Sequence, residues 1–260
     1  MKTQKMMRKH EITEDTFLGG KLVIEQPREG YRAGNDSVLL ASSLFLRPYQ
    51  TLLDLGCGVG TAFLCALARE RSLKVTAVEL QKQLSDLAIR NVQKNGFCAD
   101  IMNLNVDEVF NVIGNRNFDH VIFNPPFFDH NAGTPSKHKS KSLSNFFSEK
   151  ELQNWLRIGM KRLKPNGTIS LISRVESLTL VLKTLEEKVG SIKILPVSSF
   201  EDMSCSRVII GGKLGSKGKL SLLPPLVMHS KSKDAKGKAS FSKLARGILY
   251  DGNSIELFGS

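Results

Sequence analysis

Short, almost continuous apolar runs alternate along this chain with segments in which apolar residues recur every three or four positions. The runs are typical of buried strands, and the spaced segments are typical of helices that lie on a sheet. We predict strands at 51–55, 74–78, 101–106, 119–123 and 168–172. We predict helices at 62–68, 84–92, 148–163 and 178–185. This alternation predicts an α/β fold with a mostly parallel sheet and helices on both faces.

The two ends of the alternating region carry further patterns. Residues 17–27 have the spacing of a small hairpin, and residues 30–42 are typical of a turn that leads into a helix. The runs at 192–197 and 207–210 predict an antiparallel hairpin at the sheet edge. Ligands of such sheets bind beyond the carboxyl ends of the strands, so residues that follow strands are the first candidates for chemistry.

Local signals also define the third predicted helix. Ser148 and Glu151 have the spacing of a capping box, which marks a helix start. Trp155 falls on the apolar face of this helix. We therefore expect Trp155 in the core and not as a surface on which bases stack.

The length and composition indicate a single domain. A chain of 260 residues with 41% hydrophobic residues can bury one substantial core. We expect an amino-terminal extension over 1–50, a core over 51–215 and a basic carboxyl-terminal extension over 216–260. No apolar run approaches about eighteen residues, and the basic start contains no apolar signal segment. The four cysteines form no CxxC pair, so we expect no disulfide, no metal site and a cytoplasmic location.

The charge of the chain is basic and unevenly distributed. Lysine and arginine exceed aspartate and glutamate by 12. Nine basic residues and one acid, Asp234, lie between 213 and 246, and Lys137, Lys139 and Lys141 follow a predicted strand. Clustered cations favour a nucleic-acid partner, because binding to phosphates releases counterions. The alternative is that these lysines are solvated surface residues without a binding role.

A glycine loop follows the first predicted strand. Gly56, Gly58 and Gly60 come directly after 51–55, and a predicted helix comes next. Glycines let a ligand approach the backbone, and the first turn of a helix presents free N–H groups. Glu79 ends the next strand, about twenty residues later, where an acid accepts ribose hydroxyls in nucleoside-binding α/β folds. The alternative for Glu79 is a solvated charge at a strand end.

The tetrapeptide Asn124-Pro125-Pro126-Phe127 closes the strand predicted at 119–123. It suits methylation of a planar amine, whose nitrogen delocalises its lone pair and is a poor nucleophile. The Asn124 side-chain oxygen and the Pro125 carbonyl are two acceptors for the amine N–H groups. Hydrogen bonds from the amine to these oxygens localise the lone pair on the nitrogen. The prolines stiffen the turn, and Phe127 is expected to stack on a flat target. Taken alone, the same residues also describe a strand that ends in a proline-rich turn.

The order of these features resembles the class I S-adenosylmethionine-dependent methyltransferases over residues 51–215. The resemblance implies a Rossmann-like fold with a seven-stranded, mostly parallel sheet, and S-adenosylmethionine as cofactor. It implies that the three glycines of the loop line the methionine moiety and that Glu79 holds the ribose. Asp107 falls where the family places an acid near the adenine amine, although two further acids lie close by. Asp54 is expected to anchor the glycine loop.

The first fifty residues narrow this resemblance. The run at 30–42 and the preceding Gln26-Pro27 are similar to the bacterial tRNA1(Val) adenine-N6-methyltransferase family. Together with the tetrapeptide and residues 223–229, the likeness spans nearly the whole chain. It implies methyl transfer to the N6 amine of the adenine next to the anticodon of a valine tRNA, with tRNA as the partner.

In that family the amino-terminal turn closes over the cofactor. The resemblance therefore makes Tyr31, Arg32 and Asn35 candidate cofactor contacts. The alternative is that Asn35 or Asp36 serves only as the cap of the helix that follows.

Three alternative functions stay open. Enzymes that methylate guanine N2 in ribosomal RNA share the tetrapeptide, although the amino-terminal run argues against this function. Glutamine-N5 methylation of release factors uses a related tetrapeptide, usually with Tyr at the position of Phe127 and with a separate helical domain. The third alternative, from another functional class, is an RNA-binding protein that keeps the fold without activity. The intact glycine loop argues against this alternative. The sequence leaves the oligomeric state open, with a monomer favoured.

Overall fold

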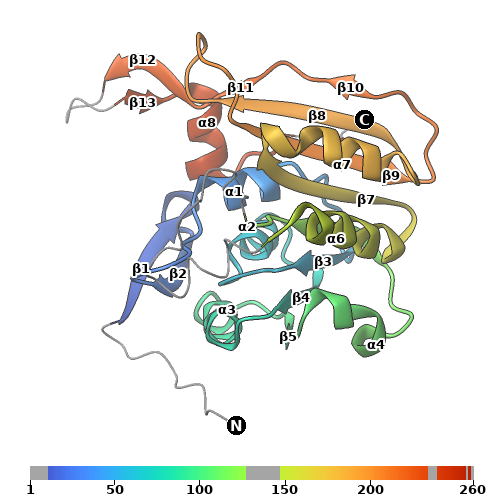
Figure 1. The fold of residues 1–260 in the computed structure, drawn as a ribbon. Helices are drawn as coiled ribbons and strands as arrows, with labels where there is room; N and C mark the ends of the chain where they lie inside the picture. Colours follow the sequence, from blue (N-terminus) through green and yellow to red (C-terminus); the bar gives the residue numbers. More distant parts are fainter. Residues whose placement is uncertain (1–10, 127–146, 234–238, 256, 259–260) are drawn as a thin grey trace.

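The computed structural model describes residues 11–126, 147–233, 239–255 and 257–258. A central sheet carries helices on both faces, and two small hairpins lie beside it (Figure 1). The strands are β1 (Ile12–Phe17), β2 (Leu22–Pro27), β3 (Thr51–Leu55), β4 (Lys74–Glu79), β5 (Asp100–Asn103), β6 (Phe118–Phe123), β7 (Leu163–Arg174), β8 (Val189–Ser198), β9 (Arg207–Leu214), β10 (Ser221–Leu222), β11 (Leu226–Val227), β12 (His229–Lys233) and β13 (Ala239–Phe241). The α-helices are α1 (Asn35–Ser42), α2 (Thr61–Arg69), α3 (Lys82–Lys94), α4 (Val109–Ile113), α6 (Glu149–Lys161), α7 (Leu178–Leu185) and α8 (Lys243–Arg246).

The central sheet has the strand order β10-β8-β9-β7-β6-β3-β4-β5, and β11 also pairs with β8. Strands β5, β4, β3, β6 and β7 run parallel, and β9 runs antiparallel between β7 and β8. The predicted α/β class and the antiparallel pair near the sheet edge are confirmed. The seven long strands match the expected seven-stranded sheet, and two strands of two residues, β10 and β11, extend it to nine. None of the helices in these described ranges is long and apolar enough to span a bilayer.

Several strand boundaries differ from the sequence prediction, and hydrogen bonds account for two of these differences. The strand expected at 101–106 ends at Asn103, because Asn105 caps the short turn that follows by accepting the N–H of Asp107. The strand expected at 168–172 begins earlier, at Leu163, because the N–H of Phe118 donates to the carbonyl of Arg162 at 2.8 Å and draws this segment into the sheet.

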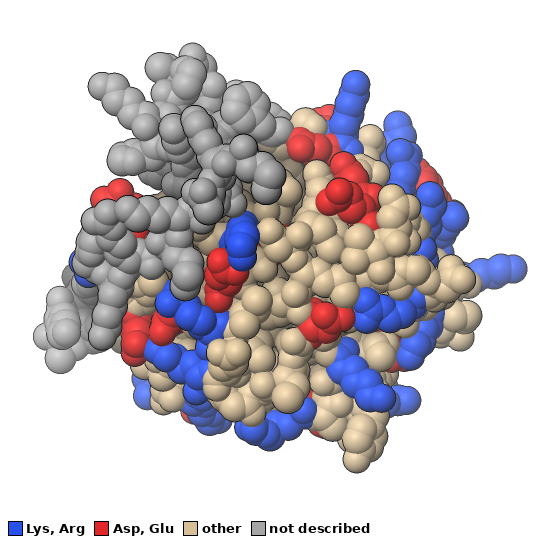
Figure 2. All heavy atoms as spheres, turned by 90° about the horizontal axis from the view of Figure 1, so that it is seen from below, with Lys and Arg blue, Asp and Glu red and all other residues tan. Residues whose placement is uncertain are grey.

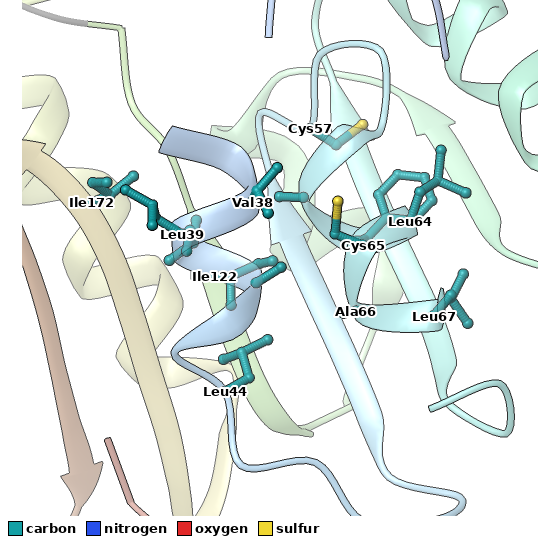
Figure 3. Close-up of a cluster of buried hydrophobic side chains, with 14 of the residues drawn as sticks. Val38, Leu39, Leu44, Cys57, Leu64, Cys65, Ala66, Leu67, Ile122 and Ile172 are labelled. Carbon is teal, nitrogen blue, oxygen red and sulfur yellow. The ribbon is translucent and has the colours of Figure 1, made fainter. Parts of the chain in front are cut away.

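Successive residues of the central strands alternate between two apolar clusters. Leu52 and Ile122 pack with α1, α2 and α3 on one face of the sheet. Leu53 and Val121 pack with α4, α6 and α7 on the other face. Figure 3 shows side chains of α1 and α2 meeting over the sheet, with the Cys65 thiol among them. Burial of one such leucine contributes roughly 1.5–3 kcal/mol, so the two layers together hold the strand ends in place.

Two asparagines, Asn91 in α3 and Asn95 directly after it, hold the amino-terminal hairpin β1–β2. Asn95 accepts from the N–H of Val23 at 2.9 Å and donates to its carbonyl at 2.8 Å. Asn91 pairs in the same way with Glu25, at 2.7 and 3.0 Å. The Asn91 amide also donates to the carbonyl of Val59 in the glycine loop at 2.9 Å. The hairpin is thereby tied to the loop at which ligand chemistry is expected.

Candidate active site

A cavity of about 260 Å³ opens at the carboxyl ends of β3, β4 and β6. Parallel strands end at one edge of the sheet, so residues far apart in the sequence meet there. The residues expected from the sequence that line this cavity are Tyr31, Gly56, Gly58, Glu79, Asp107, Asn124 and Pro126.

The loop after β3 requires glycine, because Gly56, Gly58 and Gly60 have φ angles of +70°, +59° and +91°. The N–H of Gly56 donates to the carbonyl of Val78 in β4 at 2.8 Å. A Cβ atom on Gly56 would lie only 2.5 Å from the ring of Trp155, so no side chain fits there. Gly60 directly precedes α2 and does not line the cavity.

The buried carboxylate of Glu79 joins the ends of two strands. Its Oε2 accepts the N–H of Gly58 at 2.9 Å, and its Oε1 accepts the N–H of Gln81 at 2.8 Å. Burial raises the pKa of Glu79, although these backbone N–H groups act in the opposite direction. The carboxylate therefore holds the glycine loop against the end of β4 while facing the cavity.

Asp54 lies beneath the glycine loop and does not line the cavity. Its carboxyl is buried and accepts a hydrogen bond from the N–H of Phe63, in the first turn of α2. Burial and the neighbouring Glu79 carboxylate raise the pKa of Asp54 to about 8. Glu79 thus holds the loop through Gly58, whereas Asp54 contacts the helix that follows the loop.

Asn124 follows β6 and brings its amide to the cavity wall. Its Nδ2 donates to the hydroxyl oxygen of Tyr31 at 3.4 Å. Its Oδ1 is buried and has no hydrogen-bond partner among the residues that the structure describes. Pro125 is buried, and Pro126 lines the cavity. Phe127 lies outside the described residues.

Tyr31 reaches this wall from the turn before α1. A Cβ on Gly58 would lie 3.5 Å from its Cε1, so the ring rests on the glycine loop. The residue is 42% exposed, but its hydroxyl end is surrounded by protein. Burial and the carboxylates of Asp36, Asp54 and Glu79 raise the pKa of Tyr31 to about 12. The phenol is therefore protonated at neutral pH.

The other two amino-terminal candidates do not line the cavity. The Arg32 guanidinium contacts the carboxylate of Asp15 at 2.5 Å and donates to the hydroxyl of Thr13 at 2.7 Å, so it is engaged with the β1–β2 hairpin. Asn35 is exposed in the first turn of α1. The cap of that helix is Gly34, so the alternative that Asn35 or Asp36 serves as its cap is wrong.

A buried glutamine, which the sequence did not mark as functional, fixes the turn that carries Tyr31. Gln26 is 1% exposed, donates to Asp15 at 3.0 Å and accepts the N–H of Ala33 at 2.8 Å. Asp15 also pairs with Arg32. Gln26 and Asp15 therefore connect the hairpin to the residues on both sides of the turn. The Gln-Pro pair before the turn was the only signal of this arrangement.

The opposite wall of the cavity combines an acid, an amide and aromatic rings. Asp107 accepts a hydrogen bond of 2.5 Å from the Asn154 side chain. Trp155 makes edge contacts with Phe123 and Phe147, at centroid distances of 6.2 and 5.0 Å. Trp155 thus packs on the core as expected, but its ring also lines the cavity, which helical spacing alone did not predict.

The three expected RNA contacts, Lys137, Lys139 and Lys141, lie outside the described residues. Within the described part of the chain, no group of three or more His, Cys, Asp or Glu side chains is arranged to hold a metal ion.

The chain is similar in sequence to named methyltransferases. The model of a family described as methyltransferase small domain matches residues 32–196, more than half of the chain. A tRNA1(Val) (adenine(37)-N6)-methyltransferase from Haemophilus influenzae is 29% identical over 59% of this chain and 66% of that protein. A protein of the same name from Glaesserella parasuis is 28% identical over 54% of this chain and 58% of that protein. The matched segments cover less than two thirds of either relative.

A solved structure shares the fold. The crystal structure of a predicted O-methyltransferase from Agrobacterium tumefaciens superposes with a TM-score of 0.67 over 84% of this chain and 97% of that chain. Its sequence identity is 21%, so this likeness concerns the fold alone.

Proposed function

Because the chain belongs to the methyltransferase small domain family, we propose that it methylates the exocyclic N6 amine of an adenine in tRNA, with S-adenosylmethionine as the methyl donor. The observation that carries this proposal is the Asn124 amide oxygen, buried at the cavity and unpaired among the described residues. The two relatives are named for adenine 37 of tRNA1(Val), and we take this anticodon-loop adenine as the target.

The residues of the cavity fit the cofactor. The Glu79 carboxylate accepts the N–H groups of Gly58 and Gln81 while facing the cavity, and we assign it to the ribose hydroxyls. Gly56 and Gly58 offer bare backbone to the methionine moiety, and Asp107 offers an acceptor to the adenine amine. Bound here, S-adenosylmethionine supplies an electrophilic methyl group. Asp54, beneath the loop, keeps these contacts in place.

The target amine is activated by acceptors on this chain. We assign the Asn124 Oδ1 and the Pro125 carbonyl to its two N–H groups, so that the nitrogen lone pair is localised. The Tyr31 hydroxyl engages the Asn124 NH2 and leaves the amide oxygen directed to the substrate. We assign Phe127 to stacking on the adenine. No general base is needed, because the nitrogen becomes acidic as it is methylated and its proton leaves to water. Positioning supplies most of the rate acceleration.

Charge supports an RNA substrate. The chain carries a net charge of +12. On the face shown in Figure 2, Lys and Arg side chains gather along the lower left and right margins, with acidic side chains between them. We propose that Lys137, Lys139 and Lys141 contact the phosphates beside the target. An unpaired adenine in an anticodon loop costs least to unstack, so this target suits an enzyme that must reach the base.

Transfer of radiolabelled methyl groups tests the proposed substrate class. The protein is incubated with labelled S-adenosylmethionine and, separately, unmodified valine tRNA transcript, ribosomal RNA or release factor. We expect label in tRNA alone. Label only in ribosomal RNA or in release factor would keep the chemistry and overturn the substrate. Saturable cofactor binding by calorimetry with no label in any acceptor would instead support an inactive RNA-binding protein.

A further inference from the structure

Four aromatic rings from the carboxyl-terminal half of the chain form a continuous column. Phe200 lies 5.5 Å from the ring of His229, and His229 stacks on Phe241 at 5.0 Å with an interplanar angle of 19°. Phe241 meets Tyr250 edge-on at 6.1 Å. The rings come from four separate segments: the turn after β8, the start of β12, the end of β13 and the short π-helix Gly247–Asp251.

The aromatic column is open to solvent, unlike the core of the sheet. Phe200, His229 and Phe241 are half-buried, and Tyr250 is 43% exposed. By contrast, Phe63 and Phe123 in the two core clusters are fully buried. The column therefore leaves ring surface accessible at its Tyr250 end.

Basic side chains border the aromatic column. The Arg246 guanidinium lies 5.2 Å from the centroid of the Tyr250 ring, and Lys243 is exposed in the same short helix, α8. Lys231, two residues after His229, is paired with Asp202 at 3.7 Å, so one acid partly neutralises the positive charge here. Aromatic faces beside cations are the combination with which proteins bind unpaired nucleotides, because bases stack on the rings and phosphates meet the cations.

The aromatic column lies at the same edge of the sheet as the candidate active site. Strands β8 and β7 both pair antiparallel with β9, and β7 is parallel to β6, so β8 and β6 end at the same edge. Phe200 follows the end of β8, and Asn124 follows the end of β6. Three strand spacings, about 14 Å, separate these two strands. In Figure 1 the hairpin β12–β13 and α8 lie on the side to which β8 points.

From this arrangement we propose that the aromatic column, with Arg246, is a stacking surface for unpaired nucleotides of the RNA substrate outside the methylated base. This inference rests on the proposed function and deepens it, because it assigns a second RNA contact to the same sheet edge. The column binds substrate and takes no part in methyl transfer.

Tyr250→Leu tests the stacking role, because leucine keeps apolar bulk and removes the ring. The matched control is Tyr49→Leu: Tyr49 is 74% exposed and precedes β3, at the opposite edge of the sheet. Affinity for unmodified valine tRNA is measured by fluorescence anisotropy and affinity for S-adenosylmethionine by calorimetry. We expect Tyr250→Leu to weaken tRNA binding about tenfold with unchanged cofactor affinity, and Tyr49→Leu to match the wild type.

Arg246→Gln provides a second variant on an exposed side chain, in case Tyr250→Leu lowers the melting temperature. We expect it to reduce the slope of log Kd for tRNA against log salt by about one. Wild-type tRNA affinity in both Tyr250→Leu and Arg246→Gln would overturn the stacking surface while leaving the proposed function intact. A parallel loss of cofactor and tRNA affinity in Tyr250→Leu would also overturn it, because that result would mean that Tyr250 only supports the fold. A wild-type protein that neither binds nor methylates tRNA would overturn the proposed function itself.

Discussion

At the scale of single residues, Asn124 divides its amide between two tasks. Its NH2 group is held by Tyr31, and its oxygen, unpaired among the described residues, is the acceptor that we propose for the substrate amine. An acceptor held in place before the substrate arrives needs no rearrangement during the reaction, which is why such groups contribute strongly to catalysis.

Replacing Asn124 by alanine removes this acceptor without touching the glycine loop. We expect turnover of tRNA to fall about 100-fold or more, since loss of one preorganised hydrogen-bonding group at a reacting centre costs this much. Cofactor affinity, measured by calorimetry, should stay nearly unchanged. Asn111→Ala on the exposed surface of α4 is the matched control. Near wild-type turnover in Asn124→Ala would remove Asn124 from the mechanism.

Tyr31→Phe separates the hydroxyl from the ring. The ring keeps its packing on the glycine loop, but the Asn124 NH2 loses its partner. We expect kcat to fall about three- to tenfold, the worth of one hydrogen bond, with little change in cofactor affinity. Steady-state kinetics at saturating cofactor measure this. An unchanged kcat would mean that the Asn124 amide is oriented without Tyr31.

The site residues differ in how far their sequence predicts their position. Glu79 and Asn124 directly follow strands, so the edge of a parallel sheet brings them together, and this is readable from the sequence. Arg32 is different, because its partner Asp15 lies on the hairpin and the pairing of the two is set by tertiary structure. Gln26 and Asn154 were missed for the same reason.

At the scale of elements, the glycine loop has little room for side chains. Gly56 combines a φ of +70° with a neighbouring Trp155 ring, and Gly96 has a φ of +65° with open space around it. Comparing substitutions at these two glycines therefore separates the cost of backbone strain from the cost of steric overlap.

We expect Gly56→Ala to lower the free energy of unfolding by roughly 3 kcal/mol, from strain and overpacking together, and to abolish saturable cofactor binding. Gly96→Ala should cost about 1 kcal/mol, from backbone strain alone, and keep cofactor binding. Urea unfolding and calorimetry measure both effects. Equal losses of stability in the two variants would contradict the contact between Gly56 and Trp155.

Sequence periodicity predicts elements whose signals are local. The capping box of Ser148 and Glu151 is present at the start of α6, with both reciprocal hydrogen bonds. Strands β10 and β11 were missed, because each has two residues and exists only through pairing with β8. The early start of β7 likewise depends on the neighbouring strand β6.

At the scale of the whole molecule, a buried histidine links stability to pH. His120 is 4% exposed, and its two ring nitrogens contact Thr168 at 2.7 Å and Gln50 at 2.9 Å. Burial lowers the pKa of His120 to about 4. The unfolded ring binds a proton near pH 6.5, so the unfolded state gains protons first and stability is lost as pH falls from about 6.5 to 4.

We expect this histidine to cost the wild type about 1.4 kcal/mol of stability between pH 7.5 and pH 5.5. His120→Gln keeps a donor and an acceptor but cannot titrate. Between the same two pH values its free energy of unfolding should therefore fall by about 1.4 kcal/mol less than that of the wild type. The raised pKa of Asp54 acts with the opposite sign, since protonation on acidification favours the folded state, and it is common to both proteins. Urea unfolding at the two pH values gives the difference, and equal losses in both proteins would contradict the buried, neutral ring.

The overall architecture was the most predictable level of this molecule. Alternating strand and helix patterns imply a parallel sheet with two covered faces, and both core clusters follow from the alternation of residues such as Leu52 and Leu53. The aromatic column was not predictable, because its rings are spread from Phe200 to Tyr250 and meet only after the strands have paired.

The identity of the methylated nucleoside tests the central claim most directly. An unmodified valine tRNA transcript is incubated with the protein and S-adenosylmethionine, digested to nucleosides and analysed by mass spectrometry. We predict N6-methyladenosine, absent when the protein is replaced by Asn124→Ala and when the anticodon-loop adenine is changed to guanine. A methylated guanosine, or N6-methyladenosine that persists after that change, would contradict the assigned amine and its place in the tRNA.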